Sequence, residues 1–175
     1  LAQGTVDWLG FNYYHPARVQ APKHDVDPWG NPVFAEEYVW PDAVMNKSRG
    51  WEIYPKGIEE CAAMLYSKLP RPIWVTENGT CDNNDRFRSR YVYEHLKTVC
   101  ESDLPFERYY HWCFCDNLEW IEGNSARFGL VSVDPVTRRR TVKDSGRFYA
   151  QIIARGGMDQ ELYDTFVSKQ EYEIR

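Results

Sequence analysis

Three segments typical of β-strands alternate with three typical of α-helices, and this order restricts the fold more than any other feature of the chain. Residues 5–11, 73–76 and 108–114 are rich in β-branched and aromatic side chains, as buried strands are. Apolar residues at helical spacing come after each of them. Such alternation favours parallel strands joined by crossover helices. We therefore expect an α/β fold, either part of a (β/α) barrel or a doubly wound sheet.

Other segments have a weaker pattern. Residues 15–55 are rich in Pro, Gly, Trp and Asp, and their aromatic side chains favour an ordered, functional loop. The third helix is expected to open with a capping box at Thr141–Asp144. Its inward side is predicted to carry Val142, Tyr149, Ile152 and Ile153, and Gly156-Gly157 to end it. Residues 158–175 are charged with scattered apolar residues, which predicts an appended helix or a mobile tail.

The composition argues against several classes of partner. A net charge of −5 without a basic stripe argues against a nucleic-acid partner, and no apolar run reaches the ~20 residues of a membrane span. The five cysteines show no C-x-x-C or zinc spacing, so free thiols in a cytoplasmic protein are expected. No metal or cofactor motif is found, and His95 is expected at a surface or boundary position of its helix.

A carboxylate ends the second predicted strand. The run Trp74-Val75-Thr76 leads into Glu77, and Asn78-Gly79 predicts a turn at once. The carboxyl ends of parallel strands are where barrel enzymes hold their catalytic groups. Glu77 is therefore a candidate catalytic residue, although a carboxylate that caps the next turn would fit this position equally well.

Two further pairs of residues suggest a site. Glu119-Trp120 follows the third strand, where a carboxylate could bind two sugar hydroxyls while a ring packs on carbon–hydrogen faces. An exposed salt-bridging Glu beside a core Trp fits as well. Asn12 and Tyr14 are spaced by two and are expected on the same side of the first strand. The Tyr14 phenol could hold a neighbouring carboxylate and favour its ionised form.

Four motifs in order make the chain resemble the C-terminal part of glycoside hydrolase family 1, the retaining β-glucosidases and β-galactosidases. They are Gly10–Tyr14, Gly50–Pro55, Val75–Gly79, and the run from Trp112 through Asp116–Trp120 to Arg127–Leu130. The resemblance implies that the three βα units are the last three of a (β/α)8 TIM barrel. Residues 1–157 would form this part of the barrel, and residues 158–175 a C-terminal extension.

The resemblance also implies a role for individual residues. Glu77 matches the catalytic nucleophile, Tyr14 the tyrosine that hydrogen-bonds it, and Asn12 a supporting asparagine. The positions that match substrate-binding residues are Trp112, Glu119, Trp120, Phe128 and Trp51, with Trp51 beside the aglycone. Members that cleave phosphosugars have other residues in place of Glu119-Trp120. An unphosphorylated β-glucoside or β-galactoside is therefore the expected substrate.

One catalytic group of such an enzyme is missing from this sequence. Retaining glycosidases need a nucleophile and an acid/base carboxyl about 5–5.5 Å apart. In the family the acid/base lies in an Asn-Glu-Pro motif, which does not occur in this chain. We therefore expect the N-terminal half of the barrel as a partner, and little or no activity of the isolated chain. The alternative is a non-catalytic sugar-binding or assembly half-barrel.

Overall fold

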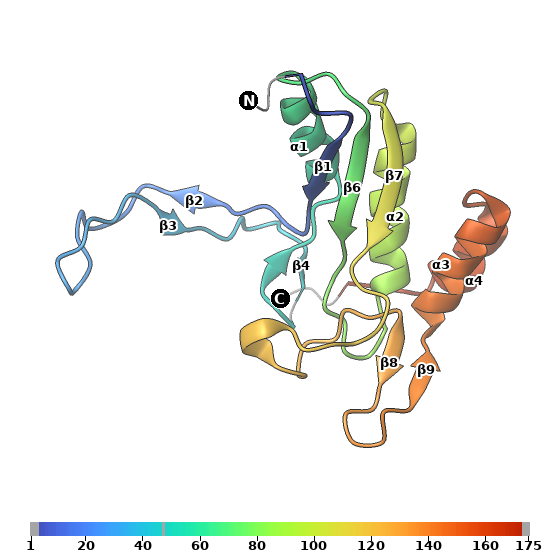
Figure 1. Ribbon diagram of the computed structural model, residues 1–175. Helices are drawn as coiled ribbons and strands as arrows, with labels where there is room; N and C mark the ends of the chain where they lie inside the picture. Colours follow the sequence, from blue (N-terminus) through green and yellow to red (C-terminus); the bar gives the residue numbers. More distant parts are fainter. Residues whose placement is uncertain (1–3, 47, 173–175) are drawn as a thin grey trace.

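A three-stranded parallel sheet forms the centre of the computed structural model, which describes residues 4–46 and 48–172. Its strands are β1 (Leu9–Asn12), β6 (Ile73–Asn78) and β7 (Phe106–His111), in the order β1-β6-β7. Helix α1 (Lys56–Tyr66) precedes β6, and α2 (Arg88–Glu101) connects β6 to β7 (Figure 1). The prediction of parallel strands that alternate with helices is thus confirmed.

The helices cover one face of this sheet. On β6, Ile73 and Val75 are buried, and Val75 packs against Ile58 of α1. Trp74, between them, points to the opposite face, where Trp8 stacks on it with ring centroids 4.1 Å apart. Every second residue of β1 is exposed. The prediction of a buried strand over residues 5–11 was therefore wrong, because this strand begins at Leu9 and packs on one side only.

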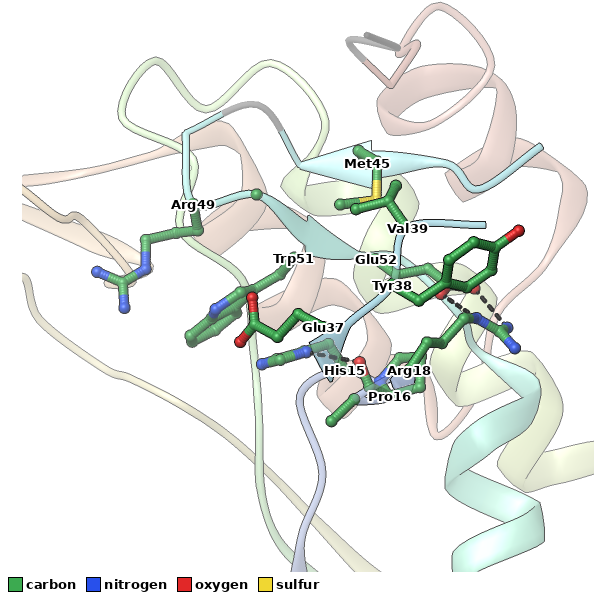
Figure 2. A pocket seen from close by; sticks show the side chains of 12 residues that line it. His15, Pro16, Arg18, Glu37, Tyr38, Val39, Met45, Arg49, Trp51 and Glu52 are labelled. Carbon is green, nitrogen blue, oxygen red and sulfur yellow. Dashed lines mark hydrogen bonds and ion pairs between the residues drawn. The ribbon is translucent and has the colours of Figure 1, made fainter. Parts of the chain in front are cut away.

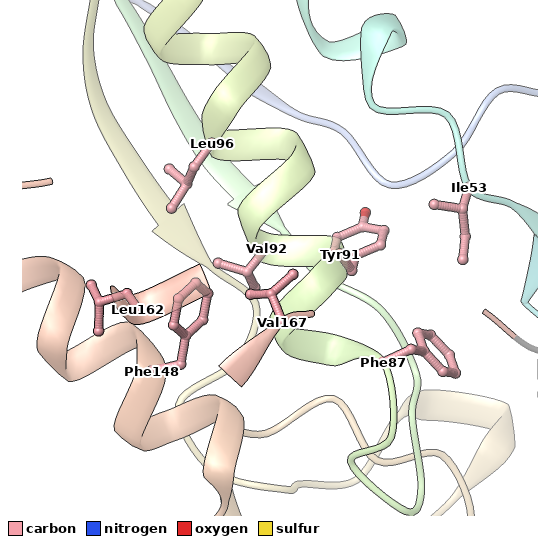
Figure 3. Packing of buried hydrophobic residues seen from close by; sticks show 8 residues of the cluster. All are labelled: Ile53, Phe87, Tyr91, Val92, Leu96, Phe148, Leu162 and Val167. Atoms are coloured by element: carbon pink, nitrogen blue, oxygen red, sulfur yellow. The ribbon is translucent and has the colours of Figure 1, made fainter. Parts of the chain in front are cut away.

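The largest buried cluster lies between three helices (Figure 3). Val92 and Leu96 of α2 meet Phe148 of α3 (Asp144–Arg155) and Leu162 of α4 (Gln160–Phe166). Helix α2 thus packs against both C-terminal helices, and Tyr149 of α3 also contacts Tyr109 of β7 directly. Helix α4 belongs to the segment for which a helix or a tail was predicted, of which residues 173–175 lie outside the described residues.

Helix α3 differs from its prediction at both its start and its buried side. Residues 140–142 form strand β9 (Arg140–Val142), antiparallel to β8 (Val131–Val133), so the first residues of the expected capping box belong to a strand and the helix begins only at Asp144. Tyr149 and Ile152 pack against the buried cluster as predicted, but Val142 and Ile153 are 47% and 68% exposed, and Phe148, which was not predicted, is fully buried. The buried side of α3 is the one that packs against α2 and α4. Gly156 ends the helix in a left-handed conformation, as predicted.

The long segment of residues 15–55 consists of two hairpins. Strands β2 (Val19–Gln20) and β3 (Glu36–Glu37) form an arm that extends away from the sheet (Figure 1). Strands β4 (Met45–Asn46) and β5 (Trp51–Glu52) lie near the end of β6. All five cysteines are unpaired, as expected. No helix in the described residues has the length and apolarity needed to cross a membrane.

Asn78 continues β6 rather than opening the predicted turn. It is fully buried, and its carboxamide has three hydrogen-bond partners. Its Nδ2 donates to the Tyr13 carbonyl (2.7 Å) and to the Tyr91 hydroxyl (3.0 Å), and the Tyr109 hydroxyl donates to its Oδ1 (2.7 Å). These bonds compensate the cost of burying an amide, and they extend the strand one residue beyond Glu77.

His95 is fully buried, so the prediction of a surface or boundary position was wrong. Its ring stacks on Tyr91 at 3.9 Å, and its Nδ1 lies 2.8 Å from the Tyr91 carbonyl oxygen. Burial lowers the pKa of His95 to about 4. The helical spacing of α2 did not show this, because the face of α2 that carries His95 is covered by Tyr13 from another segment.

We expect the free energy of unfolding to fall as the pH drops from the ordinary histidine pKa toward the lowered pKa of His95. In that window the unfolded state takes up a proton on His95 and the folded state does not. Between neutral pH and pH 5, the free energy of unfolding of a His95→Met variant, measured by urea unfolding, should fall by about 1–2 kcal/mol less than that of wild type. The exposed His24→Gln serves as control. Equal losses in wild type and His95→Met would contradict the assignment.

Candidate active site

A hollow of about 410 Å³ lies at the carboxyl ends of β6 and β7, and we call it the Glu77 hollow. Its lining comes from segments that are far apart in the sequence: Tyr14, Arg49, Trp51, Glu77, Trp112, Glu119, Trp120, Ile121, Glu122 and Phe128. The structure therefore brings together seven of the eight predicted site residues. The exception is Asn12.

Glu77 is half-buried in this hollow and is held by a phenol. The Tyr14 hydroxyl, just beyond β1, donates a 2.6 Å hydrogen bond to Glu77 Oε2. Burial, and then the bond to Glu77, raises the pKa of Tyr14 well above its ordinary value. Tyr14 therefore stays protonated and remains a donor at any physiological pH. The bond orients one oxygen of the carboxylate, and no partner of Oε1 is found among the described residues.

Glu119 also lines the hollow. The Trp112 indole Nε1 donates to Glu119 Oε1 over 3.2 Å, which connects the residue after β7 to the following loop. Burial raises the pKa of Glu119, while the Trp112 bond and the charge of Arg49 oppose this shift. A carboxylate beside two indoles can accept hydroxyl hydrogen bonds while the rings contact an apolar face.

Trp120 stands at the rim of the Glu77 hollow. It opens the short 3₁₀ helix η1 (Trp120–Glu122), its φ is +49°, and its side chain is 87% exposed. A bulky residue rarely adopts a positive φ, and such residues concentrate at functional sites. A large exposed indole on a backbone of this kind supports contact with a ligand rather than a place in the core.

Trp51, on β5, is surrounded on several sides. The His15 imidazole stacks on it at 4.5 Å, and the Arg49 guanidinium carbon lies 4.8 Å from its ring. Tyr14 and Phe128 contact it at 5.8 and 5.9 Å between ring centroids. In Figure 2, Arg49 and His15 lie on opposite sides of the Trp51 ring. This packing holds the indole rigidly and limits the surface that it presents to a ligand.

Asn12 lies beside Glu77 but outside the hollow. The two residues are register partners of the parallel pair β1 and β6. The Thr76 hydroxyl donates to Asn12 Oδ1 over 2.7 Å. The strand ends at Asn12, so Tyr14 is not held to the alternation on which the same-side prediction depended. In this structure Asn12 supports the strand end rather than lining the Glu77 hollow.

The acidic residues of the 15–55 segment do not reach the Glu77 hollow. Glu37 and Glu52 line a separate hollow of about 230 Å³ (Figure 2). The Arg18 guanidinium donates to both oxygens of Glu52, at 2.5 and 2.7 Å. Glu36 accepts from the Lys23 backbone amide. Among the described residues, only Glu119 and Glu122 share the hollow with Glu77 as carboxylates.

Sequence reasoning did not find Arg49 and Glu122. The structure joins them in an ion pair of 2.7 Å between Nη1 and Oε1. Each lies next to or inside a motif that the sequence analysis singled out, since Arg49 precedes Gly50-Trp51 and Glu122 follows Trp120 by two. Their pairing depends on how two distant loops meet, and no local pattern indicates it.

Gly79 lets the ends of β6 and β7 approach each other. A Cβ at this position would lie 1.9 Å from the Trp112 carbonyl oxygen, a backbone atom. We expect Gly79→Ala to lower the free energy of unfolding by about 2 kcal/mol or more, measured by urea unfolding. Gly157→Ala is the control, because its Cβ would meet no atom within 4 Å. Equal stability of both variants would show that the strand ends can separate freely.

Comparison with known proteins finds a matching family. The sequence profile of Glycosyl hydrolase family 1 matches residues 1–158. A Beta-glucosidase of Agrobacterium sp. (strain ATCC 21400) is 37% identical over 161 residues, which are 84% of this chain and 34% of that protein. The 6-phospho-beta-glucosidase GmuD of Bacillus subtilis (strain 168) is 32% identical over 177 residues, or 90% of this chain and 38% of that protein.

A solved structure shows the same fold. The beta-glycosidase from Pyrococcus horikoshii superposes with a TM-score of 0.78 at 32% identity, covering 91% of this chain and 37% of that protein. The chain therefore spans about a third of the length of the relatives that it matches. The fold prediction is confirmed: the three βα units are the C-terminal portion of a (β/α)8 barrel.

Proposed function

Because the chain belongs to glycosyl hydrolase family 1, we propose that it is the nucleophile-bearing C-terminal part of a retaining β-glycosidase. The proposed reaction is hydrolysis of β-glucosides or β-galactosides by double displacement. The observation that carries the proposal is the 2.6 Å bond from Tyr14 to Glu77, in a hollow shared with Trp112 and Glu119. A half-buried phenol and a strand-end carboxylate supply an oriented nucleophile.

Glu77 would act through the oxygen that Tyr14 does not bind. Oε1 attacks the anomeric carbon as the bond to the leaving oxygen breaks, and a glycosyl ester of Glu77 forms. Water then cleaves that ester and returns the carboxylate. By binding Oε2, Tyr14 fixes the direction in which Oε1 points, and such orientation lowers the barrier by removing unproductive geometries.

Other residues that line the hollow would hold the sugar. Glu119, fixed by the Trp112 indole, accepts hydrogen bonds from hydroxyls, and the Trp112 ring packs against the sugar's carbon–hydrogen face. Trp120 would contact the sugar from the rim of the hollow, while Phe128 and Trp51 supply further apolar lining. Asn12 supports the strand end that carries Glu77, through Thr76.

The acid/base carboxyl would come from the part of the parent protein that this chain does not contain. Two observations support such a partner. The sheet has one face without a covering helix, and its outer strands β1 and β7 each have one unpaired edge in the described residues. Exposed sheet edges favour association. The alternative is that the chain binds sugar or assembles with another half without performing chemistry.

An unphosphorylated sugar is the proposed substrate. One relative is named a 6-phospho-beta-glucosidase and another a Beta-glucosidase at similar identity, so overall similarity does not separate the two classes. The support comes from Glu119, whose carboxylate would repel a phosphate group at the same position.

Glu77→Gln in the full-length parent should lower kcat on an aryl β-glucoside by at least about 10³-fold, because the amide is a poor nucleophile. Binding of the sugar, measured by calorimetry, should remain. Wild type should also prefer the glucoside to its 6-phosphate. Glu101→Gln, at the exposed end of α2, is the control. Near-normal turnover in Glu77→Gln would refute the proposal.

The isolated 175-residue chain distinguishes the proposal from its alternative. With an activated aryl β-glucoside the leaving phenolate hardly needs protonation, so Glu77 should become glycosylated slowly while turnover stays below detection. Mass spectrometry of the peptide that contains Glu77 measures this, and the chain with Glu77→Gln is the control. The absence of both labelling and turnover would favour the alternative, in which the chain is a half-barrel that assembles with another half and performs no chemistry.

A further inference from the structure

The ion pair between Arg49 and Glu122 is part of the lining of the Glu77 hollow. Arg49 lies in the turn between β4 and β5, and Glu122 is the last residue of η1. The pair therefore connects two loops that are distant in the sequence and that both line the hollow.

Hydrogen bonds to a buried residue anchor the turn that carries Arg49. The backbone amides of Arg49 and Gly50 donate to the Asn46 carbonyl at 3.2 and 2.7 Å. Asn46 is 1% exposed, and its Nδ2 donates to Thr80 Oγ1 and to the Cys81 carbonyl, both at 2.8 Å. The Arg49 guanidinium also lies over the Trp51 ring. This turn is thus anchored to the segment that follows β6.

Glu122, in contrast, belongs to an exposed loop. Leu118 and Ile121 are 67% and 98% exposed, so few apolar contacts hold the loop. The Glu122 backbone amide donates to the Glu119 carbonyl at 2.9 Å, so the two residues are linked within one turn of the loop. Among the described residues, side-chain hydrogen bonds from Trp112 to Glu119, from Asn83 to Ser125 and from Asn117 to Cys113 also connect the loop to the rest of the chain.

The charges in the hollow also single out Arg49. It is the one cationic side chain among the described residues that line the Glu77 hollow, where three carboxylates face it. Its charge opposes the rise in the pKa of Glu119. An arginine in this place offsets repulsion among the carboxylates as well as holding the loop.

We propose that Arg49 is a positioning residue for sugar binding: through Glu122 it holds the η1 loop so that Glu119 and Trp120 face the Glu77 hollow. The proposal rests on the proposed function and deepens it. Arg49 acts through other residues and does not itself take part in the chemistry. Because the pair is 20% and 38% exposed, its loss should change sugar affinity by about two- to fivefold.

A double-mutant cycle in the full-length parent tests this proposal. Arg49→Met and Glu122→Gln should each raise KM for an aryl β-glucoside about two- to fivefold and leave kcat within about twofold. The double variant should be no worse than either single variant, since all three lose the same pair. Arg49→Lys should retain part of the sugar affinity that Arg49→Met loses. Arg147→Met, which breaks the exposed pair with Asp144 on α3, is the control.

A second measurement does not depend on catalysis. Hydrogen exchange of the peptide that covers residues 117–126 reports the loop amides, and it should be about two- to fivefold faster in Arg49→Met and Glu122→Gln. Unchanged exchange, or additive effects on KM, would overturn the role of the pair. If wild type shows no glycosidase activity, or if Glu77→Gln retains it, the glycosidase function is refuted. Hydrogen exchange then still decides whether Arg49 positions the loop.

Discussion

The buried carboxamide of Asn78 is the interaction on which this site depends. It joins the segment after β1, through the Tyr13 carbonyl, to Tyr109 of β7 and to Tyr91 of α2. A buried amide left without its partners costs about 1–3 kcal/mol, so the three strand ends and the helix adopt one relative position. Glu77, the preceding residue, thereby receives a defined place and direction.

The same network reaches the partner of Glu77. The Tyr91 hydroxyl, which accepts from Asn78, donates to the Tyr14 carbonyl at 3.1 Å, and the Tyr14 hydroxyl donates to Glu77. A chain of hydrogen bonds therefore leads from the buried core back to the candidate nucleophile. Since α2 carries Tyr91 and packs against α3 and α4, the C-terminal helices support the site although none of their residues line it.

One part of the site lies on strands that helices pack against, and the other part lies on a loop. Helices cover one face of the sheet and fix Glu77, whereas Trp74 and Trp8 lie together on the face without helices. On the loop side, Trp112 and Arg49 each hold one residue of the loop that carries Glu119. This division corresponds to the proposed roles, with a rigid nucleophile and a more adaptable sugar-binding loop.

The sequence by itself determined what depends on neighbouring residues: the alternation of strands and helices, the carboxylate near a strand end, the glycine that ends α3, and the motifs of the family. Seven of the eight residues predicted for the site line one hollow. Only the tertiary structure decided the burial of His95, the buried side of α3, the extension of β6 through Asn78, and the pairing of Arg49 with Glu122. Each of these depends on contacts between distant segments, and the free energy of such contacts is set by packing and desolvation rather than by local periodicity.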